Sequence, residues 1–175
     1  MRTITAEDIM IPLDNYPHIT YNHTLRQAIE EFEKAELEIN GRKSLPRVIL
    51  VFDEELNLMG MARRRDILRG LEPDFLLHKP LEQRKNLFLL ETDPDISELN
   101  YEKIIQGIKA QSERTVMDIM QPIVATVRHD DHITKVMYEL VIHNVALLPV
   151  VRDGEVAGVV RSVDVFSKMA RIVLE

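Results

Sequence analysis

The pentapeptide Asp8-Ile9-Met10-Ile11-Pro12 near the start of the chain returns as Asp118-Ile119-Met120-Gln121-Pro122 after its middle. The same order of signals follows each copy: an extended stretch, an amphipathic helix pattern, an apolar hairpin, and a glycine followed six residues later by an aspartate. This parallel order predicts two copies of one structural unit. We expect the function to depend on what the two copies form together, because neither half carries a recognisable catalytic motif.

The composition excludes several classes of protein. The formal net charge is −7, whereas general nucleic-acid binders carry an excess of Lys and Arg, so no nucleic-acid partner is expected. The chain contains no cysteine, which excludes disulfides and thiolate chemistry. No run approaches the ~20 apolar residues that cross a bilayer, and the N-terminus lacks the apolar core of a signal peptide. We therefore expect a cytoplasmic protein that does not bind membranes.

The regular structure of the first copy begins with a helix pattern. Thr24 and Gln27 have the spacing of a capping box, in which the N-cap and the third residue of a helix satisfy each other's backbone N–H groups. Apolar residues recur on one face between residues 25 and 32. We therefore expect an amphipathic helix that begins after Thr24, runs to about Glu36 and is broken by Asn40-Gly41.

An apolar hairpin follows in each copy. In the first, the run 48–52 has no polar interruption, which predicts a strand covered on both faces. We expect this strand to turn at 53–55 and to return over 56–62, after which Asp66 can cap a new helix. The second copy predicts a helix capped by Asp130-Asp131, a strand at 146–151, a turn at 152–155, a return strand at 156–160, and a last helix opened by Asp164.

The chain divides into a first unit at 1–70, an insert at 71–113 and a second unit at 114–175. Within the insert, apolar residues on one face predict a helix over 100–109. A unit of about 60 residues has only a marginal core by itself. We therefore expect the two units to bury their apolar sheet faces against each other, related by a pseudo-two-fold axis.

The order of these elements resembles the cystathionine-β-synthase (CBS) domain, and the chain is similar to a tandem CBS pair, also called a Bateman module. The stretch from Leu148-Pro149-Val150-Val151 through Gly158 to Asp164 carries the most specific part of the resemblance. The first copy is looser, because Ile49-Leu50-Val51-Phe52 stands where the family prefers Leu-Pro-Val-Val. The resemblance implies an α/β (α+β) fold of two pseudo-symmetric units, each a small sheet packed by helices, paired through their sheets.

The resemblance also implies a regulatory function without catalysis. Such modules bind AMP, ADP, ATP or another adenosyl compound in the clefts between two units, with no required cofactor. They often assemble as homodimers and pass the ligand signal to a separate effector protein. The alternative for this chain is a ligand-free scaffold for protein–protein interaction or dimerisation.

In this family a ribose-binding motif runs Gly-apolar-x-Thr/Ser-x-x-Asp, and its carboxylate accepts hydrogen bonds from the ribose hydroxyls. The chain keeps the glycine and the aspartate twice, as Gly60 with Asp66 and Gly158 with Asp164. Each aspartate also follows a strand and opens a helix, where it can act simply as an N-cap. Both roles therefore remain open at this point.

The chain departs from the motif at the Thr/Ser position, where Arg63 stands in the first copy and Arg161 in the second. A guanidinium there can weaken ribose recognition, or it can direct its donors at a phosphate. For the arginine run 63–65, the simpler alternative is a solvated surface. The ligand-binding role of both arginines is thus a hypothesis that depends on where their side chains point.

In the family, the aspartate of each copy faces the leading loop and the strand start of the other copy. Simple core packing is the alternative role for the apolar members of this set. The resemblance implies that Asp66 works with Gln121, Ile123, Ala125, Val145 and Ala146, and that Asp164 works with Ile11, His18 and Arg47.

No residue pattern predicts a metal site or an enzyme. The six histidines do not have the spacing of a metal-binding cluster, and His129 is expected to lie outside the helix that follows it. The sequence also contains no nucleophile elbow, P-loop or dinucleotide-binding glycine motif.

Overall fold

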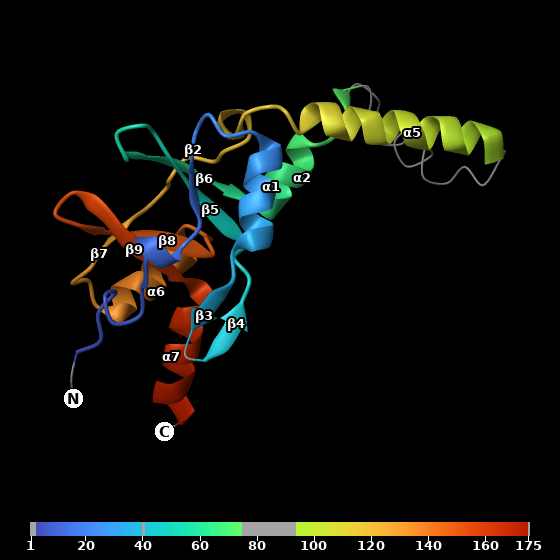
Figure 1. Cartoon of the computed structure of the whole chain (residues 1–175). Helices are drawn as coiled ribbons and strands as arrows, with labels where there is room; N and C mark the ends of the chain where they lie inside the picture. Colours follow the sequence, from blue (N-terminus) through green and yellow to red (C-terminus); the bar gives the residue numbers. More distant parts are fainter. Residues whose placement is uncertain (1–2, 40, 75–93, 175) are drawn as a thin grey trace.

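The computed structural model describes residues 3–39, 41–74 and 94–174, with the backbone alone at 94–100. Its strands and helices form two similar halves that lie side by side, and the long helix α5 extends away from them (Figure 1). The elements are β1 (Ile11–Pro12), β2 (His18–Thr20), α1 (Leu25–Lys34), β3 (Leu37–Ile39), β4 (Arg42–Ser44), β5 (Val48–Phe52), β6 (Leu58–Arg63), α2 (Arg64–Gly70), α5 (Pro94–Gln111), β7 (Val127–Arg128), α6 (Ile133–Ile142), β8 (Leu147–Arg152), β9 (Glu155–Arg161) and α7 (Ser162–Leu174).

Each half contains the same small sheet. In the first, β5 pairs with β2 in parallel and with β6 antiparallel. In the second, β8 pairs with β7 in parallel and with β9 antiparallel. A tight turn joins β8 to β9, where Asp153 and Gly154 both have positive φ, as two-residue hairpin turns require. The repeat predicted from the sequence is therefore confirmed, including both apolar hairpins.

The two halves exchange their leading segments. Strand β1 pairs with β9 of the other half, with Ile11 opposite Val159 and Pro12 opposite Gly158. In the reverse direction, Gln121 pairs with Met61 of β6 through backbone bonds of 2.7 and 2.9 Å. Each Asp-Ile-Met peptide therefore leads the chain onto the return strand of the opposite half.

This crossing explains the two glycines of the repeated motif. A Cβ built on Gly158 would lie 2.3 Å from the carbonyl oxygen of Ile11, and one on Gly60 would lie 2.6 Å from that of Gln121. No Cβ fits so close to a backbone oxygen, so a larger residue would force the paired backbones apart. The glycines therefore allow the close approach that joins the halves.

The residues before each crossing enter the core of the opposite half. Ala6 is fully buried among the residues of α6, β8 and β9, and its amide donates to Asp131. In the same way Val116 is fully buried against α1 and β5, and its amide donates to His23. The first residues of each unit therefore complete the core of the other unit. The predicted division of the chain stays a prediction, with units at 1–70, 71–113 and 114–175.

A central cluster fills the space between the two sheets. Val48, Leu50 and Phe52 on one face of β5 pack with Leu147 of β8 and Val159 of β9. The residues between them, 49 and 51, face the helices α1 and α2 instead. Strand β5 is therefore covered on both faces, and the units bury each other's sheet face, as the sequence predicts.

Several predicted boundaries were wrong. Helix α1 ends at Lys34, and the chain then forms the hairpin β3–β4 where we expected a helix end and a break. Asn-Gly between two strands is a strong hairpin signal, and Gly41 has a φ of +75°. Helix α5 is longer than the predicted 100–109, and residues 75–93 of the insert lie outside the described residues. Helix α6 is capped by His132, whose Nδ1 accepts from the amide of Thr134, and not by Asp130-Asp131.

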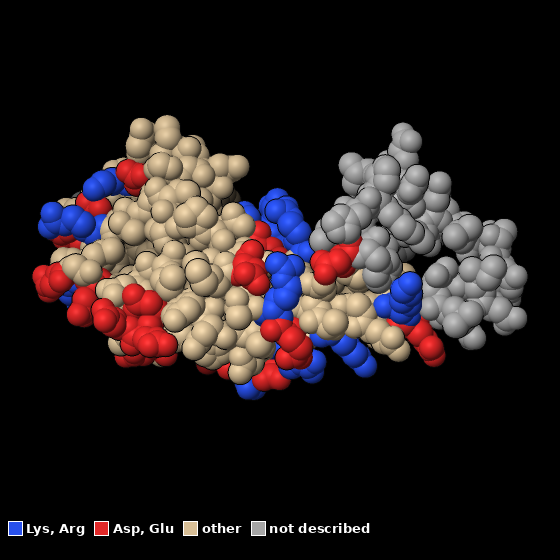
Figure 2. Space-filling view, turned by 90° about the horizontal axis from the view of Figure 1, so that it is seen from above, with Lys and Arg blue, Asp and Glu red and all other residues tan. Residues whose placement is uncertain are grey.

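The surface charge is mixed on the face that Figure 2 shows. Blue and red groups lie next to each other at the edges, and a broad uncharged area lies over the body. In the part of the chain that the structure describes, no helix is long and apolar enough to cross a membrane.

We predict that Gly158→Ala lowers the free energy of unfolding by about 1–3 kcal/mol, the usual cost of overpacking. The control is Glu155→Ala on the same strand, where an exposed side chain should change stability by about 0.5 kcal/mol or less. Urea unfolding followed by circular dichroism measures both. Equal stability of the two variants would contradict the close approach.

Candidate functional site

The repeated motif places an arginine and an aspartate at each junction between a return strand and a helix. In the second half, Arg161 ends β9, and its Nε and Nη2 donate to the two carboxylate oxygens of Asp164 at 2.7 and 2.8 Å. In the first half, Arg63 ends β6 and makes the same two bonds to Asp66 at 2.7 and 2.9 Å. Both guanidinium groups therefore point back at the aspartate of their own motif.

Neither aspartate is the N-cap of its helix, which was one of the two roles that the sequence left open. Helix α2 begins at Arg64 and α7 at Ser162, so each aspartate is the third helical residue and the preceding arginine occupies the cap. Asp66 accepts the backbone N–H of Arg63 at 3.0 Å, which is the reciprocal half of a capping box. The carboxylates thus complement the positive helix end from inside the first turn.

The two ion pairs differ in burial. The side chain of Asp66 is 1% exposed, and that of Asp164 is 14% exposed. Burial alone raises the pKa of Asp66, but the hydrogen bonds and the charge of Arg63 lower it by more, so the net pKa lies below its usual range. The ion pair of Asp66 with Arg63 therefore keeps its carboxylate away from solvent, whereas the carboxylate of Asp164 retains contact with solvent.

Arg161 also contacts the first half. Its Nη1 donates to the hydroxyl of Ser44 on β4 at 2.9 Å. One guanidinium thus bonds to the aspartate of its own helix and to the hairpin of the opposite half. The contact holds β4 beside the start of α7.

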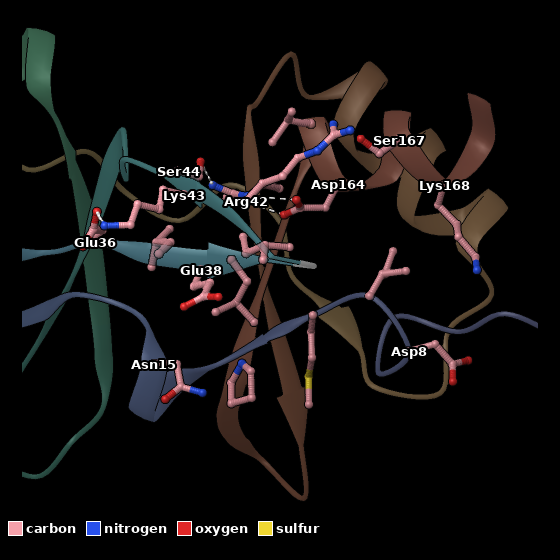
Figure 3. Close-up of a pocket in the computed structure, with 18 of the residues that line it drawn as sticks. Asp8, Asn15, Glu36, Glu38, Arg42, Lys43, Ser44, Asp164, Ser167 and Lys168 are labelled. Carbon is pink, nitrogen blue, oxygen red and sulfur yellow. Dashed lines mark hydrogen bonds and ion pairs between the residues drawn. The ribbon is translucent and has the colours of Figure 1, made fainter. Parts of the chain in front are cut away.

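Asp164 and Arg161 line a cleft of about 920 Å³ between the halves. In Figure 3, Asp164, Ser167 and Lys168 lie along α7, and Glu38, Arg42, Lys43 and Ser44 of the hairpin lie opposite them. Asp8 and Asn15 extend from the leading segment that runs beneath. The lining residues are Asp8, Ile9, Met10, Ile11, Pro12, Asn15, Glu36, Leu37, Glu38, Ile39, Arg42, Lys43, Ser44, Arg161, Val163, Asp164, Ser167, Lys168 and Arg171.

Of the three residues expected to face Asp164, Ile11 alone lines this cleft. His18 lies on β2, where its Nδ1 bonds to the carbonyl of Tyr16 at 2.8 Å, and it lines a separate cleft of about 300 Å³. Arg47 is exposed, and its carbonyl accepts from the amide of Arg64. The β3–β4 hairpin lines the wall of this cleft where we expected His18 and Arg47.

Tyr16 is a site neighbour that the sequence analysis missed. It is 3% exposed, and its hydroxyl donates to the carbonyl of Val48 at 2.6 Å. Burial raises the pKa of Tyr16 above its usual range, with Arg161 lowering it and Asp164 raising it. Tyr16 therefore stays neutral beside the Arg161–Asp164 ion pair. Its hydroxyl also occupies the backbone carbonyl of Val48, the first residue of β5.

The residues expected to work with Asp66 make backbone and packing contacts in the structure. Gln121 is held by its backbone bonds to Met61, two residues before Arg63. The others pack into hydrophobic clusters or support the helix start. Ile123 packs on the central cluster, Ala125 and Val145 pack on the core of the second half, and the carbonyl of Ala146 accepts from the amide of Ser162 at 2.9 Å.

Within the described residues, no group of three or more His, Asp or Glu side chains is placed to hold a metal ion. His129 lies before α6, as predicted. Whether the candidate residues bind a ligand stays a prediction.

The Asp66 ion pair predicts a specific pH dependence. Because the pKa of Asp66 in the folded protein lies below the value of about 3.9 in the unfolded chain, its stabilising contribution is present above that value. The contribution is lost as the pH falls through the folded pKa. We expect the free energy of unfolding to fall between about pH 4 and pH 2, and to fall less steeply in Asp66→Asn.

A second variant tests the cause of this pKa. Arg63→Gln removes the donors that lower the pKa of Asp66, so its folded pKa should rise toward or above that of the unfolded chain. The loss of stability between about pH 4 and pH 2 should then be smaller than in the parent protein. Urea unfolding at a series of pH values gives these curves. Identical curves for the parent protein and both variants would contradict the role of the pair.

Comparison with known proteins agrees with this architecture. The CBS domain model matches residues 6–73 and 116–171. The CBS domain of a CBS domain containing membrane protein from Sphaerobacter thermophilus is similar in structure, with a TM-score of 0.66, 18% identity, and coverage of 95% of this chain and 88% of that one. Comparison with curated proteins found no match.

Two similar structures contain adenosyl compounds. The CBS domain pair of protein MJ0100, in complex with 5′-methylthioadenosine and S-adenosyl-L-methionine, has a TM-score of 0.63 and 18% identity, covering 98% of this chain and 99% of that one. CBSX2 in complex with AMP has a TM-score of 0.61 and 19% identity, covering 97% and 98%. The crossing of the halves, the repeated glycine–aspartate motif and the two matched regions together show that the chain belongs to the CBS domain family, as a tandem pair.

Proposed function

We propose that this CBS pair is a non-catalytic regulatory module that binds an adenine nucleotide or a related adenosyl compound beside Asp164. The observation that carries the proposal is the cleft of about 920 Å³ that has this partly exposed carboxylate in its wall. The effector protein and the cytoplasmic location expected from the sequence belong to the same proposal. The adenosyl ligands of MJ0100 and CBSX2 support the choice of ligand class.

The chemistry of Asp164 suits a ribose. A carboxylate has about four acceptor positions, and Arg161 occupies two of them. The remaining positions can accept bonds from ribose hydroxyls, while the guanidinium holds the carboxylate in one orientation. Charge-assisted bonds of this kind contribute roughly 1.5–3 kcal/mol each.

The Asp66 site is less suited to a ligand. Its carboxylate is almost fully buried and already accepts three hydrogen bonds from Arg63. A ribose could reach it only after that ion pair had opened. We therefore propose one adenosyl ligand in each chain, at Asp164, and a structural role for Asp66.

A ligand-free scaffold is the second candidate function. The observation that favours it is that an arginine occupies both oxygens of each motif aspartate. A scaffold would keep these ion pairs as packing elements and would not respond to nucleotides. A binding experiment on the whole chain distinguishes the two functions.

We predict that adenosine, AMP, ADP or ATP stabilises the protein. At ~100 times its dissociation constant a ligand adds about 2.7 kcal/mol, which raises the Tm of a chain of this size by about 5–10 °C. Asp164→Ala should abolish the shift. Thermal unfolding with each compound at millimolar concentration measures it.

The matched control is Asp66→Ala, the equivalent change in the other half. It lowers the Tm without ligand, because it leaves Arg63 without its partner, but it should retain the nucleotide shift. No shift with any of the four compounds would favour the scaffold. A shift that persists in Asp164→Ala would move the site elsewhere.

We also propose that the module forms a homodimer through the second half. Phe166 of α7 is 74% exposed and Val141 of α6 is 75% exposed, and further apolar side chains on both helices are also exposed. The outer face of α1, by contrast, carries Glu30, Glu33 and Lys34. The exposed apolar face is therefore larger on α6 and α7 than on α1. A second copy of the chain would cover this face.

Phe166→Glu should shift the protein from dimer to monomer, because a charge in an apolar interface cannot be desolvated without a partner. Leu68→Glu is the matched control, since Leu68 is 67% exposed at the equivalent position of α2. Sedimentation velocity reports the mass of each variant. A monomeric parent protein, or an unchanged dimer in Phe166→Glu, would contradict this interface.

A further inference from the structure

The cleft beside Asp164 contains cations that its ion pairs do not use. Arg42 of β4 and Lys168 and Arg171 of α7 line it. Two other lining cations are paired: Lys43 with Glu36 at 2.8 Å, and Arg161 with Asp164. Across the described residues, Arg42, Lys168 and Arg171 make no such ion pair, so three positive charges remain for another partner.

Helical spacing places two of these cations in line with Asp164. Lys168 and Arg171 follow Asp164 by four and seven residues, which puts all three on one face of α7. At 1.5 Å per residue they lie about 6 Å and about 10 Å further along the helix axis. A ligand whose ribose binds Asp164 would therefore extend over both cations if it continued along the helix.

The third cation comes from the element that breaks the symmetry of the halves. In the first half the connection from α1 to β5, residues 35–47, contains the hairpin β3–β4. The equivalent connection from α6 to β8, residues 143–146, is a short turn. The hairpin faces α7 across the cleft (Figure 3). Arg42 therefore adds a charge to the Asp164 cleft that has no counterpart in the other half.

The acidic groups in the cleft cancel these charges only in part, because its lining carries four acidic and five basic side chains. Apart from the paired Glu36 and Asp164, the cleft is lined by Asp8 and Glu38. Asp8 accepts bonds from the backbone and hydroxyl of Thr5 at 2.9 and 3.2 Å, and so contributes to its own turn. Arg171 also complements the C-terminal end of α7, but the helix dipole does not account for Arg42 on the hairpin.

From this arrangement we infer that the ligand carries a chain of phosphates, as ADP or ATP does, and that Arg42, Lys168 and Arg171 bind its outer phosphates. This inference rests on the proposed function. The ribose binds at Asp164, and the chain of phosphates runs along α7 between the helix and the hairpin. Arginine and lysine both suit phosphate oxygens, through a fork of donors and a point charge respectively.

Titration calorimetry of the full chain with adenosine, AMP, ADP and ATP tests the inference. Affinity should rise with each phosphate beyond the first, and added salt should weaken ATP binding more than AMP binding. Arg42→Gln and Lys168→Gln should each lower the affinity for ATP about tenfold and change that for AMP by about twofold or less. Arg65→Gln is the matched control, because it removes an exposed cation of α2 outside the cleft.

The possible outcomes separate this inference from the proposed function. Equal affinities for AMP and ATP, or variants that bind ATP like the parent protein, would overturn the phosphate site and leave an adenosyl site at Asp164. An equal loss in Arg65→Gln would show a general effect of net charge and would overturn it too. If none of the four compounds binds, the proposed function fails first.

Discussion

The structure depends on one close contact made twice, in which the backbone of each leading segment lies against a glycine on the return strand of the other half. At Gly158 the carbonyl of Ile11 occupies the space of a side chain, and at Gly60 the carbonyl of Gln121 does the same. The pairing joins two sheets that would each have a marginal core alone into one body. It also places Ile11 in the wall of the cleft at Asp164.

The two arginine–aspartate pairs have nearly the same geometry but different surroundings. Asp66 is closed in by its arginine and the start of α2, whereas Asp164 faces the cleft. Desolvation makes a buried carboxylate depend on its partner, so the first pair is tied to stability. A carboxylate with the same partner but some exposure can exchange solvent for a ligand. One motif can thus serve packing in one half and binding in the other.

The hairpin β3–β4 distinguishes the surroundings of Asp164 from those of Asp66. It extends from the first half to the start of α7, and the bond from Arg161 to Ser44 holds it there. This bond makes the guanidinium a link between the motif aspartate and a segment that the second half lacks. A ligand beside Asp164 would therefore lie next to the bond that holds the hairpin.

The sequence by itself determined the repeat, the apolar hairpins, the capping box of α1 and the motif positions, because these depend on local spacing and on the periodicity of apolar residues. It also pointed to the exchange of a hydroxyl for arginine at positions 63 and 161. The tertiary structure alone decided where those guanidinium groups point, that Tyr16 closes on Val48, and that the hairpin replaces His18 and Arg47 on the cleft wall. Such facts arise from contacts between residues far apart in the chain, whose partners are chosen by packing and desolvation and leave no local pattern.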